Sequence, residues 1–418
     1  MGHLAGKDLY RKLGKKIDNL SMRAPWNEKL YAMLKVLYTE EEADLLVKMP
    51  YGFEKLDQIA EVTGYEKTKL LKMLDELCEK GLVMDILFPG GYRYTISPMI
   101  IGIFEYTMMR TRGDLNPKLW SELFKDYMMG DETFFKANAG HGEKSSIMRA
   151  MPHEETVFAS EHVEILDYEK TSLLLEKSKK FAIGMCSCRH EKMHLDEKEC
   201  DVPLEVCTTF GSAADFMIRH GFAKEVSREE MTDLFEQSRE RGLIFAADNV
   251  KKGTSFVCHC CGCCCNVMLG ITRFGYPNII VTSTYITKVD SEKCISCGKC
   301  AKACPVNAIK WEKKAVPQID EKFCLGCGVC SLKCSTGSMK LVKRNQRVLH
   351  PENTFERVIL QYLDHGSLQN LLFNNPQSTT HGFMRAFVGG FLRLPPVKKS
   401  LMSDVLRSRF LGFIKKGM

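Results

Sequence analysis

Apolar residues recur at helical spacing over much of residues 28–97. The segment EEADLLVKM has one apolar face, and KLDQIAEVTGY repeats the spacing before a turn at Gly64. The segment EKTKLLKMLDELCEKGLV is the most periodic, and its predicted inward face is Leu70, Leu71, Leu74, Leu77 and Cys78. Apolar and polar residues then alternate around Pro-Gly-Gly in LVMDILFPGGYRYTIS, which predicts a β-hairpin. The expected order is helix, helix, short helix, long helix and hairpin.

This order of elements resembles a winged-helix domain, which we place at residues 28–112 after an N-terminal helix in residues 1–27. The outward side of the long helix carries basic and acidic side chains together, namely Lys67, Thr68, Lys69, Lys72, Asp75, Glu76 and Glu79. The hairpin adds Arg93. Because a DNA-reading face is usually strongly basic, the mixed face favours a docking or structural role, with DNA binding as the alternative. We expect the isolated Cys78 to be a small core residue.

In the middle of the chain, short apolar runs predict buried strands in a cysteine-rich α/β domain at residues 181–285. The run KKFAIGM leads into Cys186, and the run GTSFV leads into Cys258. A third strand is predicted in LIFAAD. If the first two strands are neighbours, the cysteines that follow them meet at one edge of the sheet.

Helices are predicted on either side of the first strand. SREEMTDLFEQSRERG opens with a capping box at Ser227 and ends at Gly242, and PKLWSELFKDYMMG is amphipathic. The second of these helices belongs to a helical connector at residues 113–180. In the same connector, HGEKSSIMRAMPHEE is polar and predicts a loop with His141 and His153 at the surface.

Residues 346–418 predict two or three helices separated at NNPQSTT and LPP. Within them, residues 382–418 hold eight basic residues against one acid, which equals the net charge of +7 of the whole chain. The basic residues are Arg385, Arg393, Lys398, Lys399, Arg407, Arg409, Lys415 and Lys416. We expect this region to dock on a redox partner or a membrane surface, and a solvated helical hairpin is the alternative.

Length and composition indicate a globular protein of two to four domains, with 418 residues, 44% hydrophobic and 27% charged. The N-terminus has no apolar run after its charges, and PMIIGIFEYTMM is too short to span a bilayer. We therefore expect a cytoplasmic protein. Because the cytoplasm keeps thiols reduced, its 19 cysteines predict metal binding, in an organism that lives with little oxygen.

An internal duplication is the clearest signal. VDSEKCISCGKCAKACPVNAIK is followed by IDEKFCLGCGVCSLKCSTGSMK, and each copy contains C-x2-C-x2-C-x3-C. The pattern covers residues 286–345 and resembles the bacterial ferredoxin module with two 4Fe–4S clusters. The resemblance implies one cluster held by Cys294, Cys297, Cys300 and Cys334, and a second held by Cys324, Cys327, Cys330 and Cys304.

The second repeat departs from the module at one position, because Pro305 follows Cys304 but Ser335 follows Cys334. Two zinc ribbons are the alternative. Zinc ribbons use paired C-x2-C knuckles without a third cysteine three residues later, so the spacing argues against them. Because thiolates hold every iron of both clusters in this module, the resemblance implies electron transfer and no substrate site.

Ten further cysteines lie outside the module, namely Cys186, Cys188, Cys200, Cys207, Cys258, Cys260, Cys261, Cys263, Cys264 and Cys265. They predict one or two additional iron–sulfur clusters. The simplest division gives the first four cysteines one centre and some of the last six another, and mixed ligation is equally compatible with the spacing. One cube cannot use six neighbouring thiolates, so some of them are expected to face a second site or a bridged cluster.

Other polar residues near these cysteines are expected to be less important. A histidine beside a metal centre more often supports the ligands than binds metal, and we expect this of His259. Arg189 and Arg241 either offset cluster charge or lie in solvent, and we expect solvent. The segment HEKMH matches the H-E-x-x-H pattern of zinc peptidases, but it lies beside Cys188 and has no third ligand at a familiar spacing.

As a whole, the chain resembles long ferredoxin-domain proteins of anaerobic metabolism. We expect an α+β multidomain electron carrier or oxidoreductase subunit that relays single electrons to or from a redox protein, without catalytic residues of its own. The alternative is a redox- or oxygen-responsive winged-helix transcription regulator with an iron–sulfur sensor. A third class, an oxidoreductase subunit that binds substrate at an extra cluster, lacks a flavin or nucleotide fingerprint, because Gly389-Gly390 has no strand–turn–helix setting.

Overall fold

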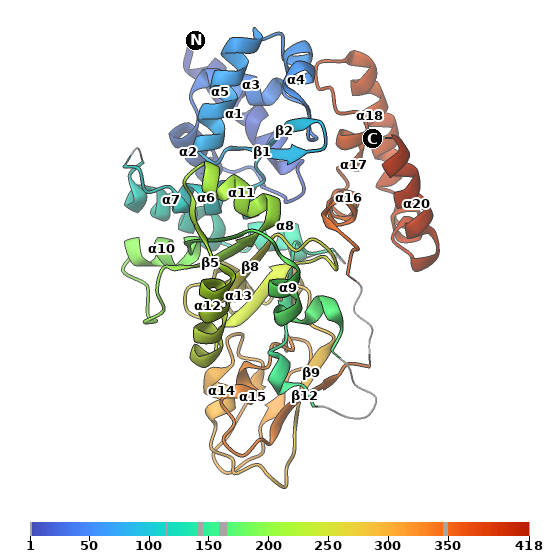
Figure 1. The fold of residues 1–418 in the computed structure, drawn as a ribbon. Coiled ribbons are helices and arrows are strands. Elements are labelled where there is room, and N and C mark those ends of the chain that lie inside the picture. Colours follow the sequence, from blue (N-terminus) through green and yellow to red (C-terminus); the bar gives the residue numbers. More distant parts are fainter. Residues whose placement is uncertain (1, 114, 141–144, 159–164, 346–349, 418) are drawn as a thin grey trace. The chain divides into compact units, whose positions relative to one another are not determined.

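The computed structural model describes residues 2–113, 115–140, 145–158, 165–345 and 350–417 (Figure 1). It mixes helices and small sheets, with 50% of the chain helical, which agrees with the expected α+β class. The chain divides into two compact units. The first is Met1–Ser145 together with Phe355–Met418, and the second is Ser146–Thr354. The finer domain boundaries expected from the sequence stay predictions.

The first unit is mostly helical and contains one hairpin. Its elements are α1 (Gly2–Asp18), α2 (Glu28–Leu37), α3 (Glu40–Lys48), α4 (Leu56–Thr63), α5 (Lys67–Glu79), β1 (Val83–Phe88), β2 (Gly91–Ile96), α6 (Phe104–Met109), α7 (Pro117–Met129), α8 (Thr133–Ala139), α16 (Thr354–Asp364), α17 (Leu368–Leu372), α18 (Thr379–Leu392), α19 (Pro395–Leu401) and α20 (Asp404–Gly417). The amphipathic helix expected from PKLWSELFKDYMMG is α7.

Helix α3 begins with a reciprocal capping box. Thr39 Oγ1 accepts the amide N–H of Glu42 at 3.2 Å, and the Glu42 carboxylate accepts the amide N–H of Thr39 at 2.9 Å. Lys80 Nζ, just after α5, donates to the same carboxylate at 2.5 Å. Since Glu42 is only 5% exposed, this side chain both closes the start of α3 and connects it to the end of α5.

Helix α5 buries one face, made of Leu70, Met73, Leu74, Leu77 and Cys78. The expectation that Leu71 shares this face is wrong, because Leu71 is 38% exposed. A residue one position after Leu70 is turned from it by roughly 100° around the helix axis. The hairpin β1–β2 follows with a register from Val83 opposite Ile96 to Phe88 opposite Gly91. The elements come in the predicted order, and the winged-helix assignment itself stays a prediction.

The C-terminal part of the first unit contains five helices in the residues that the structure describes, where two or three were expected. The breaks at NNPQSTT and LPP fall between α17 and α18 and between α18 and α19, as predicted. The helices pack around a shared apolar cluster of Ile359, Tyr362, Leu363, Leu368, Leu371, Leu392, Leu411 and Ile414. Short apolar segments between polar turns therefore each form a separate helix.

The second unit combines a six-stranded sheet with two small two-stranded sheets. Its elements are β3 (Met148–Met151), α9 (Thr171–Lys177), β4 (Phe181–Met185), α10 (Ser187–His194), β5 (Glu205–Phe210), α11 (Gly211–Arg219), β6 (Ala223–Val226), α12 (Arg228–Arg241), β7 (Ile244–Asp248), β8 (Phe256–Cys260), α13 (Asn266–Phe274), β9 (Tyr285–Val289), α14 (Lys299–Ala303), β10 (Ile309–Lys310), β11 (Gln318–Ile319), α15 (Val329–Leu332) and β12 (Met339–Lys343).

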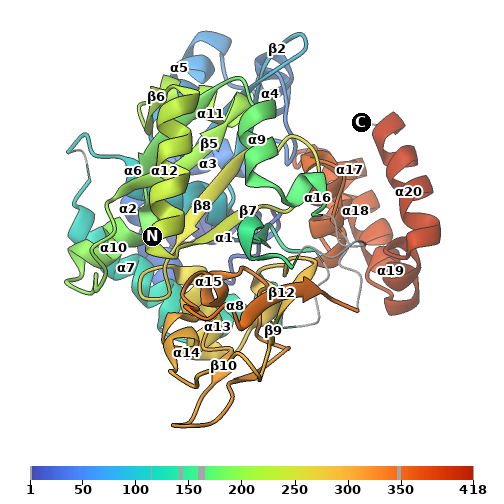
Figure 2. The same ribbon diagram turned by 60° about the horizontal axis from the view of Figure 1, so that its bottom comes forward.

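The large sheet has the order β3-β7-β8-β5-β4-β6, and its paired strands are antiparallel. Helices α9 and α12 lie against one face of it (Figure 2). As predicted, α12 begins with a capping box at Ser227 and ends at Gly242, whose φ of 76° is left-handed. The apolar cluster under these helices is Met151, Leu175, Phe181, Ile183, Phe210, Val226, Met231, Phe235, Phe245, Ala247 and Val257.

The loop expected in HGEKSSIMRAMPHEE contains a strand instead. Strand β3 pairs with β7 and carries Arg149, which is 1% exposed and donates to the carbonyl of Tyr168 at 2.6 Å. His153 is also buried, with Nε2 2.9 Å from the carbonyl oxygen of Leu243, so its predicted surface position is wrong. The strand was missed in the sequence because polar residues such as Arg149 and His153 are buried there, with backbone carbonyls as their hydrogen-bond partners. His141 lies outside the described residues.

None of the helices in the described part of the chain is both long and apolar enough to cross a lipid bilayer.

Replacing Glu42 with alanine tests the connection between α3 and α5. The change removes the capping box and leaves Lys80 without its buried partner, so the local opening free energy should fall by about 2–4 kcal/mol. The matched control is Glu41→Ala, because Glu41 is 54% exposed in an ion pair with Lys69 and its loss should cost within about 0.5 kcal/mol. Hydrogen exchange of the amides in α3–α5 measures both. Equal effects of the two substitutions would contradict the role given to Glu42.

Candidate metal centres

The ferredoxin module, residues 286–345, folds as two similar halves. Strand β9 pairs with β12, and β10 pairs with β11. In each half a glycine follows the second cysteine and begins the short helix α14 or α15, with φ of 75° at Gly298 and 84° at Gly328. A side chain at Gly298 would also meet the ring of Trp311 at 2.8 Å. These left-handed glycines turn each C-x2-C-x2-C loop tightly, as cluster binding requires.

The first set of module cysteines is Cys294, Cys297, Cys300 and Cys334, and all four line one small cavity. Three come from one repeat and one from the other. A donor set of sulfur alone in this arrangement fits an iron–sulfur cube. Burial raises the pKa of Cys334, but hydrogen bonds from Ser338, the Met339 amide and Thr336 outweigh burial and lower it to about 7. Ser338 Oγ lies 3.2 Å from this sulfur.

The second set is Cys324, Cys327, Cys330 and Cys304, whose thiols interact with one another. The amide N–H of Ala308 donates to the sulfur of Cys304 at 3.2 Å, and Thr287 Oγ1 lies 3.3 Å from that of Cys330. Such hydrogen bonds are one means by which a protein adjusts a cluster's potential. Ile309 and Met339 pack beside the cysteines and exclude water. These residues also fit a cube.

Strand pairing brings part of the other ten cysteines together. Strands β4 and β8, expected to be neighbours, are separated by β5, which sequence patterning missed. Strand β5 carries Cys207, which lies directly opposite Cys258 on β8. Side chains alternate between the faces of a sheet, so Cys258 and Cys260 share one face while His259 points to the other, toward α12.

Six cysteines gather on that face: Cys186, Cys188, Cys207, Cys258, Cys260 and Cys265, called here the six-cysteine group. Cys188 lies on α10, and Cys186 and Cys265 occupy the positions just before α10 and α13. The sulfurs of Cys260 and Cys265 are 3.4 Å apart. Cys258 interacts with both Cys207 and Cys260, and Cys188 interacts with Cys265. Both sequence segments thus contribute to one group.

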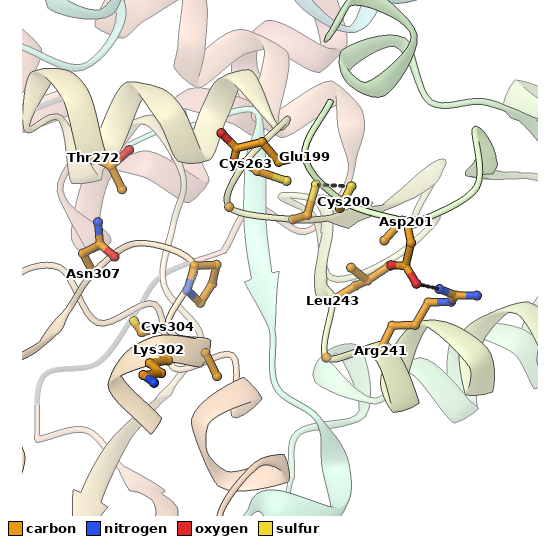
Figure 3. Close-up of a pocket in the computed structure, with 16 residues that line it drawn as sticks. Glu199, Cys200, Asp201, Arg241, Leu243, Cys263, Thr272, Lys302, Cys304 and Asn307 are labelled. Atoms are coloured by element: carbon orange, nitrogen blue, oxygen red, sulfur yellow. Dashed lines mark hydrogen bonds and ion pairs between the residues drawn. The ribbon is translucent and has the colours of Figure 1, made fainter. Parts of the chain in front are cut away.

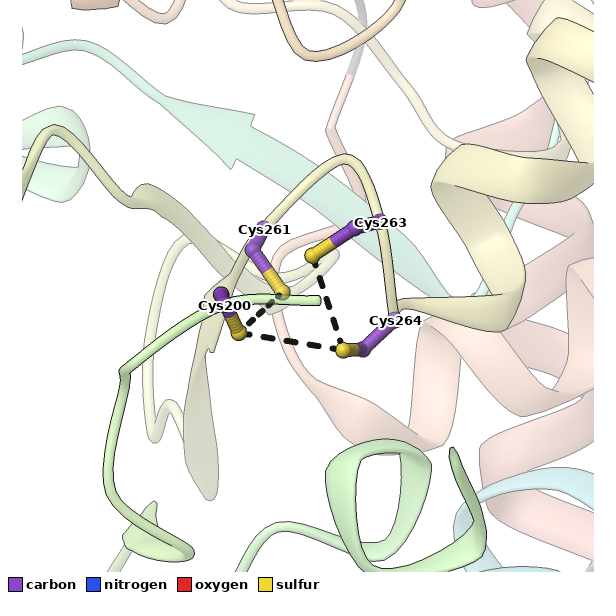
Figure 4. A group of neighbouring side chains, drawn as sticks. All are labelled: Cys200, Cys261, Cys263 and Cys264. Atoms are coloured by element: carbon purple, nitrogen blue, oxygen red, sulfur yellow. Dashed lines mark hydrogen bonds between the residues drawn. The ribbon is translucent and has the colours of Figure 1, made fainter. Parts of the chain in front are cut away.

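The remaining four are Cys200, Cys261, Cys263 and Cys264, called here the four-cysteine group (Figure 4). Their sulfurs all lie within 4.8 Å of one another. Cys200 is 3.8 Å from Cys261 and 3.8 Å from Cys264, and Cys263 is 3.5 Å from Cys264. A metal–sulfur bond of about 2.3 Å gives a tetrahedron with edges of roughly 3.8 Å. These spacings therefore fit one tetrahedral metal ion, and sulfur ligands select zinc or iron.

This division differs from the simplest one expected from the sequence, which placed Cys200 with Cys186, Cys188 and Cys207. The structure instead shows the mixed arrangement that the spacing had left open. Cys200 lies on the irregular segment between α10 and β5, and that segment carries it to the loop after β8. Sequence spacing does not report the path of such a segment.

Crowding of the thiols produces opposite pKa shifts within one group. Burial raises the pKa of Cys186 to about 12. Hydrogen bonds with Cys258 and Cys265 lower the pKa of Cys260 to about 6 in spite of burial. Thiols held this closely cannot all ionise in the absence of a cation. Metal ions remove the conflict, since they bind thiolates and displace the protons.

Arg189 lies between the two groups, so its predicted position in solvent is wrong. It is 1% exposed, and its Nη2 donates to the carbonyl of His259 at 2.7 Å. Burial opposes its charge, but cysteines of both groups, Cys186, Cys261 and Cys260, outweigh burial and raise its pKa. Its position one residue after Cys188 was the signal in the sequence. A buried guanidinium here offsets the negative charge of metal–thiolate centres.

A cavity of about 650 Å³ adjoins the four-cysteine group (Figure 3). Its walls include Cys200, Cys261 and Cys263, and also Cys304 of the ferredoxin module. Arg241 also lines it and pairs with Asp201 at 3.4 Å, with its side chain 38% exposed, which agrees with the expected contact with solvent.

The loop 261–263 packs directly against the ferredoxin module. A Cβ atom at Gly262 would lie 2.9 Å from the carbonyl oxygen of Pro305, the residue after Cys304. Glycine is required here because the two backbones approach closely. The four-cysteine group and one ligand of the module are therefore held on contacting loops.

His259 and the H-E-x-x-H segment have structural partners. The ring of His259 packs on Phe235, and its Nδ1 lies 2.7 Å from Ser238 Oγ, while burial lowers its pKa to about 3. His190 and His194 lie on α10 with their Nε2 atoms 2.8 Å apart. Glu191, however, accepts from Asn266 at 2.6 Å and pairs with Lys192. The Glu191 carboxylate is therefore held by Asn266 and Lys192.

Serine substitutions test whether the ten cysteines form these two groups. Cys200→Ser should remove metal bound by the four-cysteine group and leave the signals of the other centres. Cys207→Ser should perturb only the six-cysteine group, so the losses of metal should add in the double variant. Cys78→Ser is the control, since Cys78 is buried on α5 and belongs to neither group. Metal analysis and electron paramagnetic resonance measure the outcome. If the two variants lost the same centre, the division would be wrong.

Comparison with known proteins agrees with this geometry. Residues 287–341 match the family model described as a 4Fe-4S dicluster domain. No curated protein and no solved structure matches the chain. The family match and the grouped cysteines identify an iron–sulfur protein with features of electron transfer.

Proposed function

We propose that this protein relays single electrons to or from a redox protein partner, through two 4Fe–4S clusters and two further metal centres. The observation that carries the proposal is the grouping of cysteines: eight fall into the two sets of the dicluster module, and ten fall into the six- and four-cysteine groups. Eighteen of the nineteen cysteines of the chain are used in this way. So many grouped thiolates are typical of a protein with several metal centres.

The residues have distinct tasks in this proposal. Bound iron–sulfur clusters supply reversible one-electron chemistry. Module cysteines hold the clusters by all their irons, so no position is left open for a substrate. Arg189 offsets negative charge between the six- and four-cysteine groups. Gly262 lets the four-cysteine loop contact the segment after Cys304, which keeps the two sites near each other.

The four-cysteine group is the proposed point of exchange with the partner. Three of its cysteines, Cys200, Cys261 and Cys263, line the open cavity. None of the cysteines of the six-cysteine group is among the residues that line this cavity. The four-cysteine group is therefore the one that the cavity connects to solvent, which suits contact with a second protein.

The alternative of a DNA-binding regulator has less support. Of the lysines on the outward side of α5, Lys67 pairs with Asp57 at 2.8 Å and Lys69 pairs with Glu41. Lys72 lies 4.0 Å from Glu76. Phosphate contacts would have to compete with these acids, so the face offers little attraction for DNA. This favours a docking or structural role for the winged-helix-like region, residues 28–112.

Metal content and spectroscopy of anaerobically purified protein test the proposal. The ferredoxin module alone should bind about eight iron ions with equal sulfide, because each cube holds four irons. Further metal should belong to the six- and four-cysteine groups. Reduced protein should show electron paramagnetic resonance signals from several centres. Colourless protein, or protein that holds only zinc, would contradict the relay. A gel shift that depends on oxidation state would favour the regulator.

Gly262→Val tests the contact between the four-cysteine loop and the module. The valine side chain collides with Pro305 and forces the loops apart, so electrons should equilibrate more slowly between the two sites after partial oxidation. Rapid freeze-quench spectroscopy follows this step. Thr272→Val is the control, because Thr272 lines the same cavity and the change keeps its shape. Gly262→Ala is the milder version if valine reduces metal content. Unchanged rates at full metal content would contradict the contact's role.

A further inference from the structure

Helix α18 in the first unit presents an exposed face that is entirely apolar. Phe383 and Phe387 are each 69% exposed, and Phe391 is 57% exposed. The rings of Phe383 and Phe387 stack with centroids 6.4 Å apart and planes 7° apart. The positions between and beyond them on this face are Ala386, Gly390 and Leu394, and the whole face reads Phe383, Ala386, Phe387, Gly390, Phe391 and Leu394.

These side chains are not needed for the core of the unit. The opposite side of α18 already packs inward, with Leu392 buried in the apolar cluster that includes Leu411 and Ile414 of α20. Gly389 lies close against Gln369, since a Cβ there would be 3.0 Å from the Gln369 side chain. The helix is thus anchored by one face, while three phenylalanines project from the other.

Basic residues also lie on α18, α19 and α20 or directly beside them. Four have partners: Lys398 pairs with Asp364 at 2.9 Å, Arg407 lies 3.7 Å from Glu356, and Arg385 and Arg393 donate to backbone carbonyls. Exposed side chains that have no acidic partner among the described residues are Lys399, Arg409 and Lys415. Phe413 of α20, which is 77% exposed, lies among them in the sequence. Figure 1 draws both helices in red.

We propose that α18 and α20 bind the surface of an anionic lipid membrane, with the phenylalanines inserted among the lipids and the free basic side chains at the headgroups. A helix with Phe and Leu on one face and Lys and Arg beside it is typical of interfacial membrane binding. Anionic headgroups attract each nearby Lys or Arg. The helices lie on the surface and do not cross it, which agrees with their length and composition.

Two other occupants fit the face less well. A second copy of the chain would bring together two regions that each contain eight basic residues and one acidic residue, and these regions would repel each other. A protein interface usually has a polar rim with hydrogen bonds around a centre that is rich in aromatic residues and arginine. The face of α18 offers no hydrogen-bonding side chain at all. Lipid chains need none.

Vesicle sedimentation of the full-length, anaerobically purified protein tests the proposal. The probes are vesicles of phosphatidylcholine alone and of phosphatidylcholine with 30% phosphatidylglycerol. We expect at least tenfold tighter binding to the anionic vesicles, weakened by salt.

The variant Phe383→Gln/Phe387→Gln/Phe391→Gln should bind the anionic vesicles at least tenfold more weakly. The control is Leu87→Gln, which should bind as tightly as the original protein. Leu87 lies on the β1–β2 hairpin and has the same exposed fraction as Phe391, 57%. Lys399→Gln/Arg409→Gln/Lys415→Gln should bind both vesicles equally weakly.

Iron content and spectra of each variant separate this proposal from the electron relay, because neither should change. Absence of binding to both kinds of vesicle would overturn the proposal. Equal binding of the original protein to neutral vesicles would overturn the role of the basic residues. A dimer that the triple glutamine variant converts to a monomer, without vesicle binding, would instead assign the face to a second copy.

Discussion

Crowding of thiols is the constraint from which the rest of the second unit follows. The cysteines of the six-cysteine group lie beside one another. The hydrogen bond between Cys258 and Cys260 raises the pKa of Cys258 and lowers that of Cys260. A protein interior does not accept several unpaired thiolates, so without metal most of these thiols stay protonated, as the raised pKa values of Cys186 and Cys188 indicate. Arg189 supplies one positive charge, which is far less than the negative charge of ten ionised cysteines. Metal ions would supply the others, and the strands, caps and loops bring the sulfurs close enough together to bind them.

The same constraint explains how six cysteines fit into the eight residues 258–265. Pleating of β8 sends Cys258 and Cys260 to one face and His259 to the opposite side. The strand then ends, and the loop turns the next sulfurs toward Cys200. Cys265, at the start of α13, returns to the first face. A run that looks like one site in the sequence is therefore shared between two sites by a change in backbone geometry.

Much of this was predictable because local rules determine it. The module repeat, the capping box at Ser227 and the end of α12 at Gly242 each depend on residues close in sequence. The rest depends on partners distant in sequence. Strand β5 has too mixed a pattern to recognise, yet it places Cys207 opposite Cys258. Arg189 looked like a surface residue because two of the cysteines that favour its charge, Cys260 and Cys261, come from a distant segment. Spacing alone could not divide ten cysteines correctly, since an irregular segment carries Cys200 to the second group.

Shared ligands also couple metal binding to folding. Strands β5 and β8 and the starts of helices α10 and α13 all contribute cysteines to the six-cysteine group, so a metal centre bound there would connect these four elements. The loop through Gly262 extends the dependence to the ferredoxin module, because it packs against Pro305. The apolar cluster beneath α9 and α12 lies on the other face of the sheet and needs no metal. The two faces of the sheet therefore differ in what stabilises them: hydrophobic burial holds one, and bound metal ions would add the free energy that holds the thiols of the other.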